Sequence, residues 1–379
     1  MSIKLISPLN KESISTVKDF PKKYIDLMHE QTPKFVNDYE FNGLNYNLDK
    51  FIKVDYYHKN RPYRQQGREI LFSFLSNSKG KHYLLLSLDS SMKKSIKFLT
   101  HNNRIKINGL RANEKYYWKI INDNEESETF SFTTKDYPRV INCGYLKNVR
   151  DFGGRMTKYG KRIKQGLVFR GPELCTKPYD DDNEMHHNFS TSSKTLKILR
   201  TLIQDGVEID LRGDAEANYI KSSLLSDKNH KVDYFRELEY GAYEHFLTID
   251  KPEFINSVKH VFELFSNADK KHVYIHCWGG ADRTGTTCFL LGAILGMSYT
   301  DLIIDYEFTS FSLECRAHYN SPNNNQYVKF YCFYDELLKY ADKNKLGRDI
   351  ENICKHLLIN RFGVKTATID KIKEVFLEK

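Results

Sequence analysis

One segment of this 379-residue chain dictates much of its architecture, because it joins a strand, a short loop and a helix without a break. Residues 272–276 read HVYIH, a short apolar strand, and residues 285–296 read as a strongly apolar helix. The loop between them begins CWGGADR, at residues 277–283. A strand that enters a buried helix through a tight loop is typical of an open α/β sheet, whose ligands bind at the carboxyl ends of the strands.

The rest of the C-terminal part alternates strands and helices in the same way. Apolar spacing indicates two amphipathic helices, at residues 194–206 and 252–269, and a buried strand at residues 207–213. Helical patterns fill most of residues 300–379. For residues 138–379 we therefore expect an α/β domain with a central, mostly parallel sheet flanked by helices.

Residues 1–136 have a different pattern, in which short apolar runs, several alternating with period two, are separated by polar turns. The runs lie at residues 69–76, 81–91, 94–100, 103–109, 115–123 and 128–134. This spacing predicts an N-terminal all-β domain, an antiparallel sandwich, with residues 133–140 as the linker to the α/β domain.

Composition and charge argue against several classes of protein. The net charge of +9 is dispersed along the chain, and no nucleic-acid-binding motif is visible. No apolar run is long enough to span a membrane, and the N-terminus lacks the apolar core of a signal peptide. We expect a cytoplasmic protein, or a secreted one if a signal peptide has been removed. The seven cysteines include no C-x-x-C pair, which favours reduced thiols and predicts neither a metal nor another cofactor.

The loop at residues 277–283 has the features of a phosphate cradle. Gly279 and Gly280 allow backbone conformations in which successive N–H groups point inward, and the following helix adds its own free N–H groups and its dipole. Arg283 can bind two phosphate oxygens with its planar guanidinium. The same features stabilise a thiolate at Cys277, which would make it a nucleophile at neutral pH.

This segment resembles the signature of the protein tyrosine phosphatase superfamily, which is His-Cys, five residues, Arg, then Ser or Thr. The Asp-Arg-Thr-Gly ending at residues 282–285 is similar to that of bacterial tyrosine phosphatases with an HCxxGxDRTG loop. NVRDFGG, GLVFRGPEL and EIDLRGDAE are similar to further motifs of that branch, in the expected order, at residues 148–154, 166–174 and 208–216. The resemblance covers residues 140–320.

A second, shorter resemblance lies in the N-terminal domain. GLRANEKYYWKI at residues 109–120, followed by FSFTT at residues 130–134, resembles the end of a fibronectin type III-like domain. The resemblance implies an interaction module that binds a protein or a carbohydrate.

The phosphatase resemblance implies a hydrolase of phosphate monoesters, first of all of phosphotyrosine in proteins, with a phosphocysteine intermediate at Cys277. Relatives of that branch also hydrolyse phosphoinositides, so a phosphoinositide or inositol-phosphate phosphatase is the alternative. Many of them carry Lys before Asp-Arg-Thr-Gly, where this chain has Ala281, which argues against the alternative. A rhodanese-like sulfurtransferase has a different loop ending, and an inactive phosphate-binding module would not need both Cys277 and Arg283.

The superfamily uses an aspartate as general acid, and two candidates stay open. Asp210, at the end of a predicted strand, is the first choice, with an ion pair to Arg212 or Arg150 as its other possible role. Asp282, inside the loop, is the second choice. Asp214 and Glu216 are weaker candidates.

The remaining residues of the expected site bind the phosphate or support the loop. Thr284 would donate a hydrogen bond to the leaving sulfur, cap the helix, or do both. His276 would orient the loop, while Arg150 and Asp151 would brace it from behind and Arg212 would support Asp210. The expected phosphate-binding set is Trp278, Gly279, Gly280, Ala281, Asp282 and Arg283.

Overall fold

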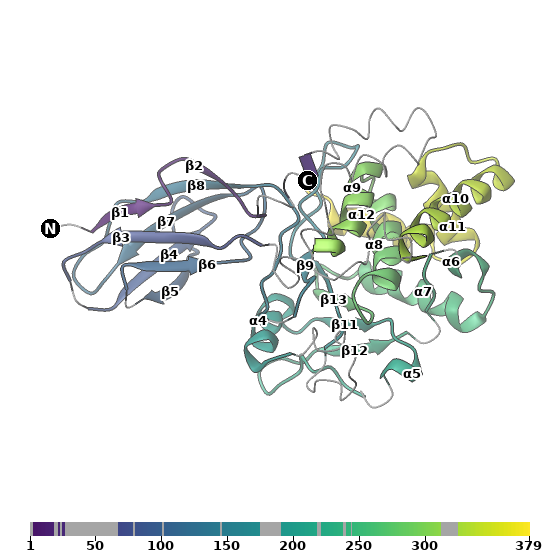
Figure 1. Cartoon of the computed structure of the whole chain (residues 1–379), viewed down its shortest axis with the longest axis horizontal. Coiled ribbons are helices and arrows are strands. Elements are labelled where there is room, and N and C mark those ends of the chain that lie inside the picture. The colour runs from purple at the N-terminus through teal and green to yellow at the C-terminus, as the bar shows by residue number, and fades with distance from the viewer. Residues whose placement is uncertain are drawn as a thin grey trace. The chain divides into compact units, whose positions relative to one another are not determined.

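The computed structural model divides the chain into two compact units, whose elements are labelled in Figure 1. Unit 1 comprises Met1–Lys22 and Gln66–Ile141, and unit 2 comprises Lys23–Gln65 and Asn142–Lys379. The structure describes residues 3–18, 22, 25–26, 67–78, 80–100, 102–144, 146–174, 191–217, 221–237, 240–243, 245–311 and 325–379. Among these residues, no helix combines the length and the apolar character that a membrane span requires.

Unit 1 is built from two β-sheets. The three-stranded sheet has the order β1–β3–β6 and the five-stranded sheet the order β2–β8–β7–β4–β5. In chain order the strands are β1 (Lys4–Ser7), β2 (Glu12–Ser15), β3 (Ile70–Leu75), β4 (His82–Ser87), β5 (Ile96–Thr100), β6 (Arg104–Ile107), β7 (Lys115–Ile121) and β8 (Phe130–Lys135). The last six coincide with the six apolar runs, which confirms the prediction of a β-rich N-terminal part.

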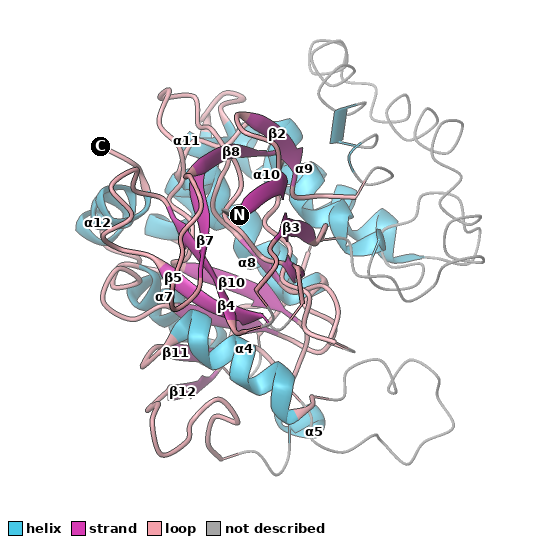
Figure 2. Cartoon of the chain, turned by 90° about the vertical axis from the view of Figure 1, so that its left-hand side faces the viewer, coloured by secondary structure: helices cyan, strands magenta, loops and turns pink. Residues whose placement is uncertain are grey.

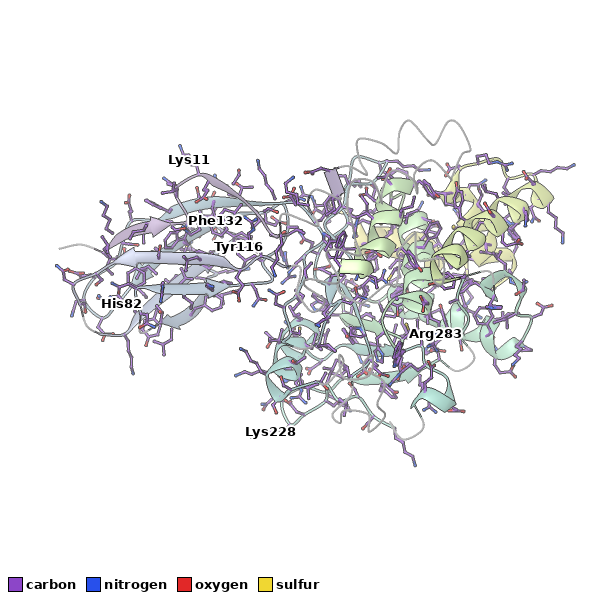
Figure 3. The ribbon with its side chains drawn as sticks, viewed as in Figure 1. Lys11, His82, Tyr116, Phe132, Lys228 and Arg283 are labelled. Atoms are coloured by element: carbon purple, nitrogen blue, oxygen red, sulfur yellow. The ribbon has the colours of Figure 1, made fainter. Side chains whose placement is uncertain are left out.

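Aromatic side chains from both sheets form the core of unit 1. Phe72 of β3 packs edge-on against Trp118 of β7 and Phe132 of β8, with ring centroids 5.1 and 5.6 Å apart. Tyr116 stacks on Phe132 at 5.5 Å, and Figure 3 labels both side chains. One pairing differs from the expected antiparallel pattern, because β2 runs parallel to β8 at the edge of its sheet.

Unit 2 contains a five-stranded sheet of order β12–β11–β13–β10–β9. Four strands are parallel, and β9 pairs antiparallel with β10 at one edge, which confirms the expected mostly parallel sheet. The strands are β9 (Arg150–Asp151), β10 (Val168–Gly171), β11 (Val207–Asp210), β12 (Asp233–Arg236) and β13 (Val273–His276). Because β13 lies between β10 and β11, the loop that follows it leaves the sheet near its centre.

Helices make up much of the rest of the described part of unit 2, and Figure 2 shows them in cyan beside the magenta strands. Their packing is set mainly by the central helix, α8, which contacts α9 and α11, while α7 contacts α12. The helices are α4 (Ser193–Ile203), α5 (Asp214–Ala217), α6 (His245–Thr248), α7 (Pro252–Phe265), α8 (Asp282–Ile294), α9 (Tyr299–Glu307), the 3-10 helix η2 (Phe308–Phe311), α10 (Asn325–Asn344), α11 (Ile350–Asn360) and α12 (Thr366–Phe376).

Local sequence explains where these helices begin and end. The side chain of Ser192 caps α4 by accepting from Thr195 N at 3.2 Å, and Pro252 occupies the first turn of α7. Helix α4 ends at Ile203, before the predicted stop, because Gln204 adopts a left-handed φ of 51°. Gly206 then serves a different purpose: a Cβ there would lie 2.1 Å from the carbonyl oxygen of His272.

Helix α8 is apolar on all sides, as expected of a helix inside a domain. Every residue from Thr284 to Ile294 is buried. Its first turn, which begins at Asp282, is therefore held firmly at the end of β13, and the loop between them has little freedom to move.

Candidate active site

The loop from Cys277 to Ala281 joins β13 to α8 and passes close to the end of β10. Gly280 has a left-handed φ of 65°, and a Cβ there would lie 2.1 Å from the carbonyl oxygen of Gly171. Only glycine fits at this point, for both its conformation and its space. The close approach fixes the loop against β10.

Backbone carbonyl groups of the loop are bound from outside it. The carbonyl of Trp278 accepts from Glu173 N at 3.0 Å, and that of Gly279 accepts from Asn148 Nδ2 at 3.0 Å. Arg170 Nη2 donates to the carbonyl of Gly280 at 2.7 Å. With three successive carbonyls held outward, the geometry favours N–H groups that face the loop centre, as an anion-binding loop requires.

Three buried arginines lie behind the loop and share one carboxylate, that of Asp305 in α9. Arg150 Nε and Arg155 Nη2 donate to Asp305 Oδ1 at 3.4 and 3.2 Å, and Arg170 Nη1 donates to Oδ2. Arg150 also donates to Asn148 Oδ1, so it acts on the loop through the Asn148 amide. Burial raises the pKa of Asp305, but the three arginines outweigh it and the net shift is downward.

Cys277 is the first residue of the loop and its sulfur is almost fully buried. Burial and the charge of Asp282 raise the pKa of the thiol. The charge of Arg283, together with hydrogen bonds from the side chain and the amide of Thr284, outweighs them and lowers the net pKa. The buried Thr284 hydroxyl has no hydrogen bond of ordinary length and angle among the described residues, which leaves it available to the nearby sulfur.

The three other cysteines whose side chains the structure describes show the effect of burial on a thiol. It raises the pKa of Cys143 to about 12. Burial is likewise the main cause that raises the pKa of Cys288 to about 11 and lifts that of Cys354. Among these four thiols, only that of Cys277 has a lowered pKa, so it carries the largest thiolate fraction at neutral pH.

Arg283 is held at the start of α8 by a carboxylate on α5. Its Nη1 and Nη2 donate to Glu216 Oε2 and Oε1 at 2.5 and 2.7 Å, and Nη1 also donates to the carbonyl of Leu211 at 3.0 Å. Figure 3 labels Arg283 beside α5. Its Nε donates to none of the described residues, so one edge of the guanidinium remains for a ligand.

His276 ends β13 and is fully buried. Its Nε2 lies 3.0 Å from Glu208 Oε1, and its Nδ1 lies 3.1 Å from the carbonyl oxygen of Cys277. Both partners are acceptors, so both bonds form only when the ring carries two protons. Burial lowers the pKa of His276, but Asp210 and Glu208 outweigh it and raise the net pKa. Both the two acceptors and the raised pKa favour the doubly protonated ring at the base of the loop.

Asp210 and Arg212 form a buried ion pair below the loop. Asp210 accepts from the amide of Arg212 at 3.0 Å, from its Nη2 at 2.7 Å, and from Tyr234 Oη at 2.7 Å. Arg212 Nη1 also donates to Glu173 at 2.6 Å. Burial raises the pKa of Asp210, but His276 and Arg212 outweigh it and lower the net pKa to about 2. Asp210 thus lies in an ion pair with Arg212, the second of the two roles that the sequence allows it.

Two further predicted aspartates, Asp282 and Asp151, lie in different surroundings. Asp282 is the first residue of α8 and is partly exposed, and its carboxylate accepts a hydrogen bond from the buried Tyr243 hydroxyl. Asp151 accepts from the amides of Gly153 and Gly166 at 2.9 and 2.7 Å. Asp151 therefore shapes the turn between β9 and β10, whereas Arg150 reaches the loop through Asn148.

Sequence reasoning assigned no role to several residues that the structure places around the loop. Glu208 had one visible signal, since a carboxylate in a short apolar strand needs a buried partner. Asn148 and Arg170 lie in the segments that carry the resemblance, yet nothing in the sequence says which atoms they bind. Tyr243 and Asp305 come from segments far from the motifs and gave no signal. Among the described residues, no group of three or more His, Cys, Asp or Glu side chains is arranged to hold a metal ion.

A thiol with a lowered pKa and a clamped arginine, set at the end of a parallel strand and the start of a buried helix, define a site for an anion next to a nucleophile. Residues 141–377 match the model of the tyrosine phosphatase family. This match spans more than half of the chain, and the chain belongs to the tyrosine phosphatase family.

Two further comparisons concern solved structures and curated protein sequences. The crystal structure of a human tyrosine phosphatase-like serine/threonine/tyrosine-interacting protein is similar, with 16% identity and a TM-score of 0.27. The similarity covers 46% of this chain and 92% of that one. No curated protein sequence matches the chain.

Proposed function

We propose that this protein is a protein-tyrosine phosphatase that hydrolyses phosphate monoesters through a phosphocysteine at Cys277. The observation that carries the proposal is the pairing of Cys277, whose pKa is lowered, with Arg283, whose guanidinium is clamped by Glu216 and keeps its Nε edge open. The loop and the start of α8 supply N–H groups for the phosphate between them. Family membership supports a phosphatase on independent grounds.

The reaction has two steps on these residues. In the first, the Cys277 thiolate attacks phosphorus, the ester P–O bond breaks, and a general acid gives its proton to the leaving oxygen. In the second, the same group, now ionised, takes a proton from water as its oxygen attacks phosphorus. The P–S bond then breaks, and inorganic phosphate and the Cys277 thiolate are released. Arg283 holds the equatorial oxygens in both steps, and Thr284 donates to the sulfur as it leaves.

We assign the general acid to Asp282. An acid must carry a proton near neutral pH, and Asp210, with a pKa of about 2 and donors on both oxygens, does not. Asp282 adjoins Arg283, is partly exposed, and lies close enough to Cys277 to affect its pKa. When it is protonated, the repulsion between its side chain and a bound phosphate disappears.

The dependence of kcat/KM on the leaving group shows whether Asp282 or Asp210 is the general acid. Asp282→Asn should lower kcat/KM by about 10²-fold for phenyl phosphate, whose leaving oxygen needs a proton, and by much less for p-nitrophenyl phosphate. It should also flatten the basic limb of the kcat/KM profile against pH. Asp210→Asn, the matched control, should lower the rates of both esters alike, because it disturbs a buried ion pair. If instead Asp210→Asn alone shows the selective loss, the assignment is wrong.

The surroundings of the loop favour a substrate with a single phosphate. Ala281 is buried and offers no cation, and the described carboxylates that act on Arg283 are those of Glu216 and Asp282. Arg236, on the neighbouring strand, is paired with Asp214 at 2.5 Å. A polyphosphorylated inositol would bring further negative charge against these carboxylates.

A substrate comparison tests the proposed class. Initial rates should give a higher kcat/KM for phosphotyrosyl peptides than for phosphoserine peptides and for mono- and bisphosphorylated phosphoinositides. The same ranking should hold for the chain with and without a neutral peptide competitor, which controls for non-specific binding. A phosphoinositide that exceeds every phosphotyrosyl peptide would replace the proposed substrate class.

A further inference from the structure

We propose that Tyr243 and Tyr306 form a hydroxyl relay that positions Asp282 for proton transfer. This inference rests on the proposed function, since it needs Asp282 as the general acid. The three side chains come from separate parts of unit 2: Tyr306 from α9, Asp282 from α8, and Tyr243 from the segment before α6. Tyr243 donates to Asp282 Oδ1, and the two tyrosine hydroxyl oxygens lie 2.5 Å apart.

The direction of this relay follows from the acceptor at its end. An ionised carboxylate can only accept, so the Tyr243 proton must point to Asp282. The Tyr243 oxygen can then accept only from Tyr306, which fixes the order as Tyr306 to Tyr243 to Asp282. Burial, with Tyr306 and Asp282 nearby, raises the pKa of Tyr243 well above its ordinary value. The hydroxyl therefore keeps its proton and remains a donor throughout.

Tyr243 is held in place by a constrained backbone. Its φ of 54° lies in the left-handed region, which a bulky residue occupies only when the surrounding structure fixes it. Its N–H donates to Thr286 Oγ1 at 3.1 Å, and Thr286 Oγ1 donates to the carbonyl of Asp282 at 3.0 Å. The tyrosine is thus tied by its backbone to the same helical turn that its hydroxyl contacts.

The position of Tyr306 depends on the glycine that ends the loop motif. A Cβ at Gly285 would lie 2.9 Å from Cδ2 of the Tyr306 ring, a distance that real contacts avoid. Gly285 therefore lets the ring approach α8 and reach Tyr243, against which it packs edge-on with centroids 6.0 Å apart. This gives the glycine of Asp-Arg-Thr-Gly a role in placing the relay.

The relay should affect the proton transfer in two ways. Because Tyr243 donates to Oδ1, the relay fixes the rotation of the Asp282 carboxyl group. It also stabilises the ionised form of Asp282, to which the positive charge of Arg283 contributes and which the neighbouring Cys277 thiolate opposes. A loss of the relay should therefore resemble a partial loss of the acid.

Tyr243→Phe tests the relay with phenyl and p-nitrophenyl phosphate. The variant should lose about tenfold in kcat/KM with phenyl phosphate and little with p-nitrophenyl phosphate, as expected for one lost hydrogen bond to the acid. The basic limb of the profile of kcat/KM against pH should move to higher pH in this variant, because the ionised carboxylate of Asp282 has lost a hydrogen-bond donor. Tyr306→Phe should change both readouts in the same direction by a smaller factor. In the Asp282→Asn background, Tyr243→Phe should add no further leaving-group dependence.

Tyr240→Phe is the matched control. Tyr240 is a buried tyrosine just before Tyr243, and its hydroxyl accepts from Thr287 of α8 at 3.1 Å without contacting Asp282. It should leave the leaving-group dependence unchanged, and thermal melting of all variants shows whether they fold. Equal losses for both esters in Tyr243→Phe, or additive effects with Asp282→Asn, would overturn the relay. A uniform loss in Asp282→Asn itself would instead overturn the acid assignment on which the relay rests.

Discussion

Replacing Cys277 with Ser should abolish turnover of p-nitrophenyl phosphate, with a loss on the order of 10⁴ to 10⁶ in kcat. The sulfur is ionised because Arg283 and Thr284 lower the pKa of the thiol. A serine hydroxyl in the same place stays protonated at neutral pH and is a poor nucleophile. The anion cradle should survive, since it consists of backbone N–H groups and Arg283. The variant should therefore still bind vanadate or inorganic phosphate, measured by calorimetry.

Cys288→Ser provides the control for this result. Cys288 is a second buried cysteine, on α8, whose thiol stays protonated because its pKa is raised to about 11. Its replacement should leave kcat within a few-fold of the wild type. Turnover by Cys277→Ser within tenfold of the wild type would exclude a covalent mechanism at this residue. Acid quenching of wild type with a phosphotyrosyl peptide should in turn trap phosphate on Cys277.

Replacing Arg283 with Lys should lower kcat/KM by about 10³-fold, although the charge is kept. The guanidinium uses one edge for Glu216 and leaves its Nε edge for the phosphate. A lysine ammonium cannot span both partners in this way. The affinity for vanadate should fall with activity, because the lost interaction is made with the transferring phosphoryl group. Steady-state kinetics and vanadate inhibition measure the two effects on the same preparation.

Glu216→Gln weakens the ion pair that holds Arg283 but keeps the positive charge of the arginine, so it tests the two contributions separately. Gln can still accept one hydrogen bond from Arg283, so this variant should raise KM with a modest effect on kcat. A lysine at position 283 that keeps wild-type kcat/KM would show that the phosphate is held by backbone groups alone. Equal losses in Arg283→Lys and Glu216→Gln would mean that Arg283 acts only when it is clamped.

The sequence was sufficient for the parts of the fold that follow from local patterns. Six strands of unit 1, the buried strand β11 and the strand–loop–helix unit around Cys277 were predicted from apolar spacing and turn residues. The periodicity of the apolar residues indicates which residues are buried and whether their spacing is that of a strand or of a helix. These elements can be predicted from that information alone. The family resemblance added the identity of the loop, and the match over residues 141–377 supports it.

What could not be predicted depends on contacts between distant segments. Asp210 illustrates this: a strand-end aspartate looks the same in the sequence whether it faces a ligand or Arg212. The difference arises from Tyr234 and Arg212, which saturate its oxygens in the folded chain. Tyr243 shows the reverse case, since no pattern around it indicates that its hydroxyl meets Asp282. Strands β1 and β2, with the sequences KLIS and ESIS, were not among the predicted strands.

The position of Asp305 links the anion-binding loop to the order in which the chain is made. Three arginines near β9 and β10 need this one carboxylate, and without it their charges would be buried uncompensated. Asp305 lies on α9, which a ribosome completes after the loop and α8. A nascent chain that ends before α9 already contains Cys277 and Arg283 but lacks the counter-charge that supports the loop. We therefore expect the loop to reach its folded geometry only after α9 has been synthesised.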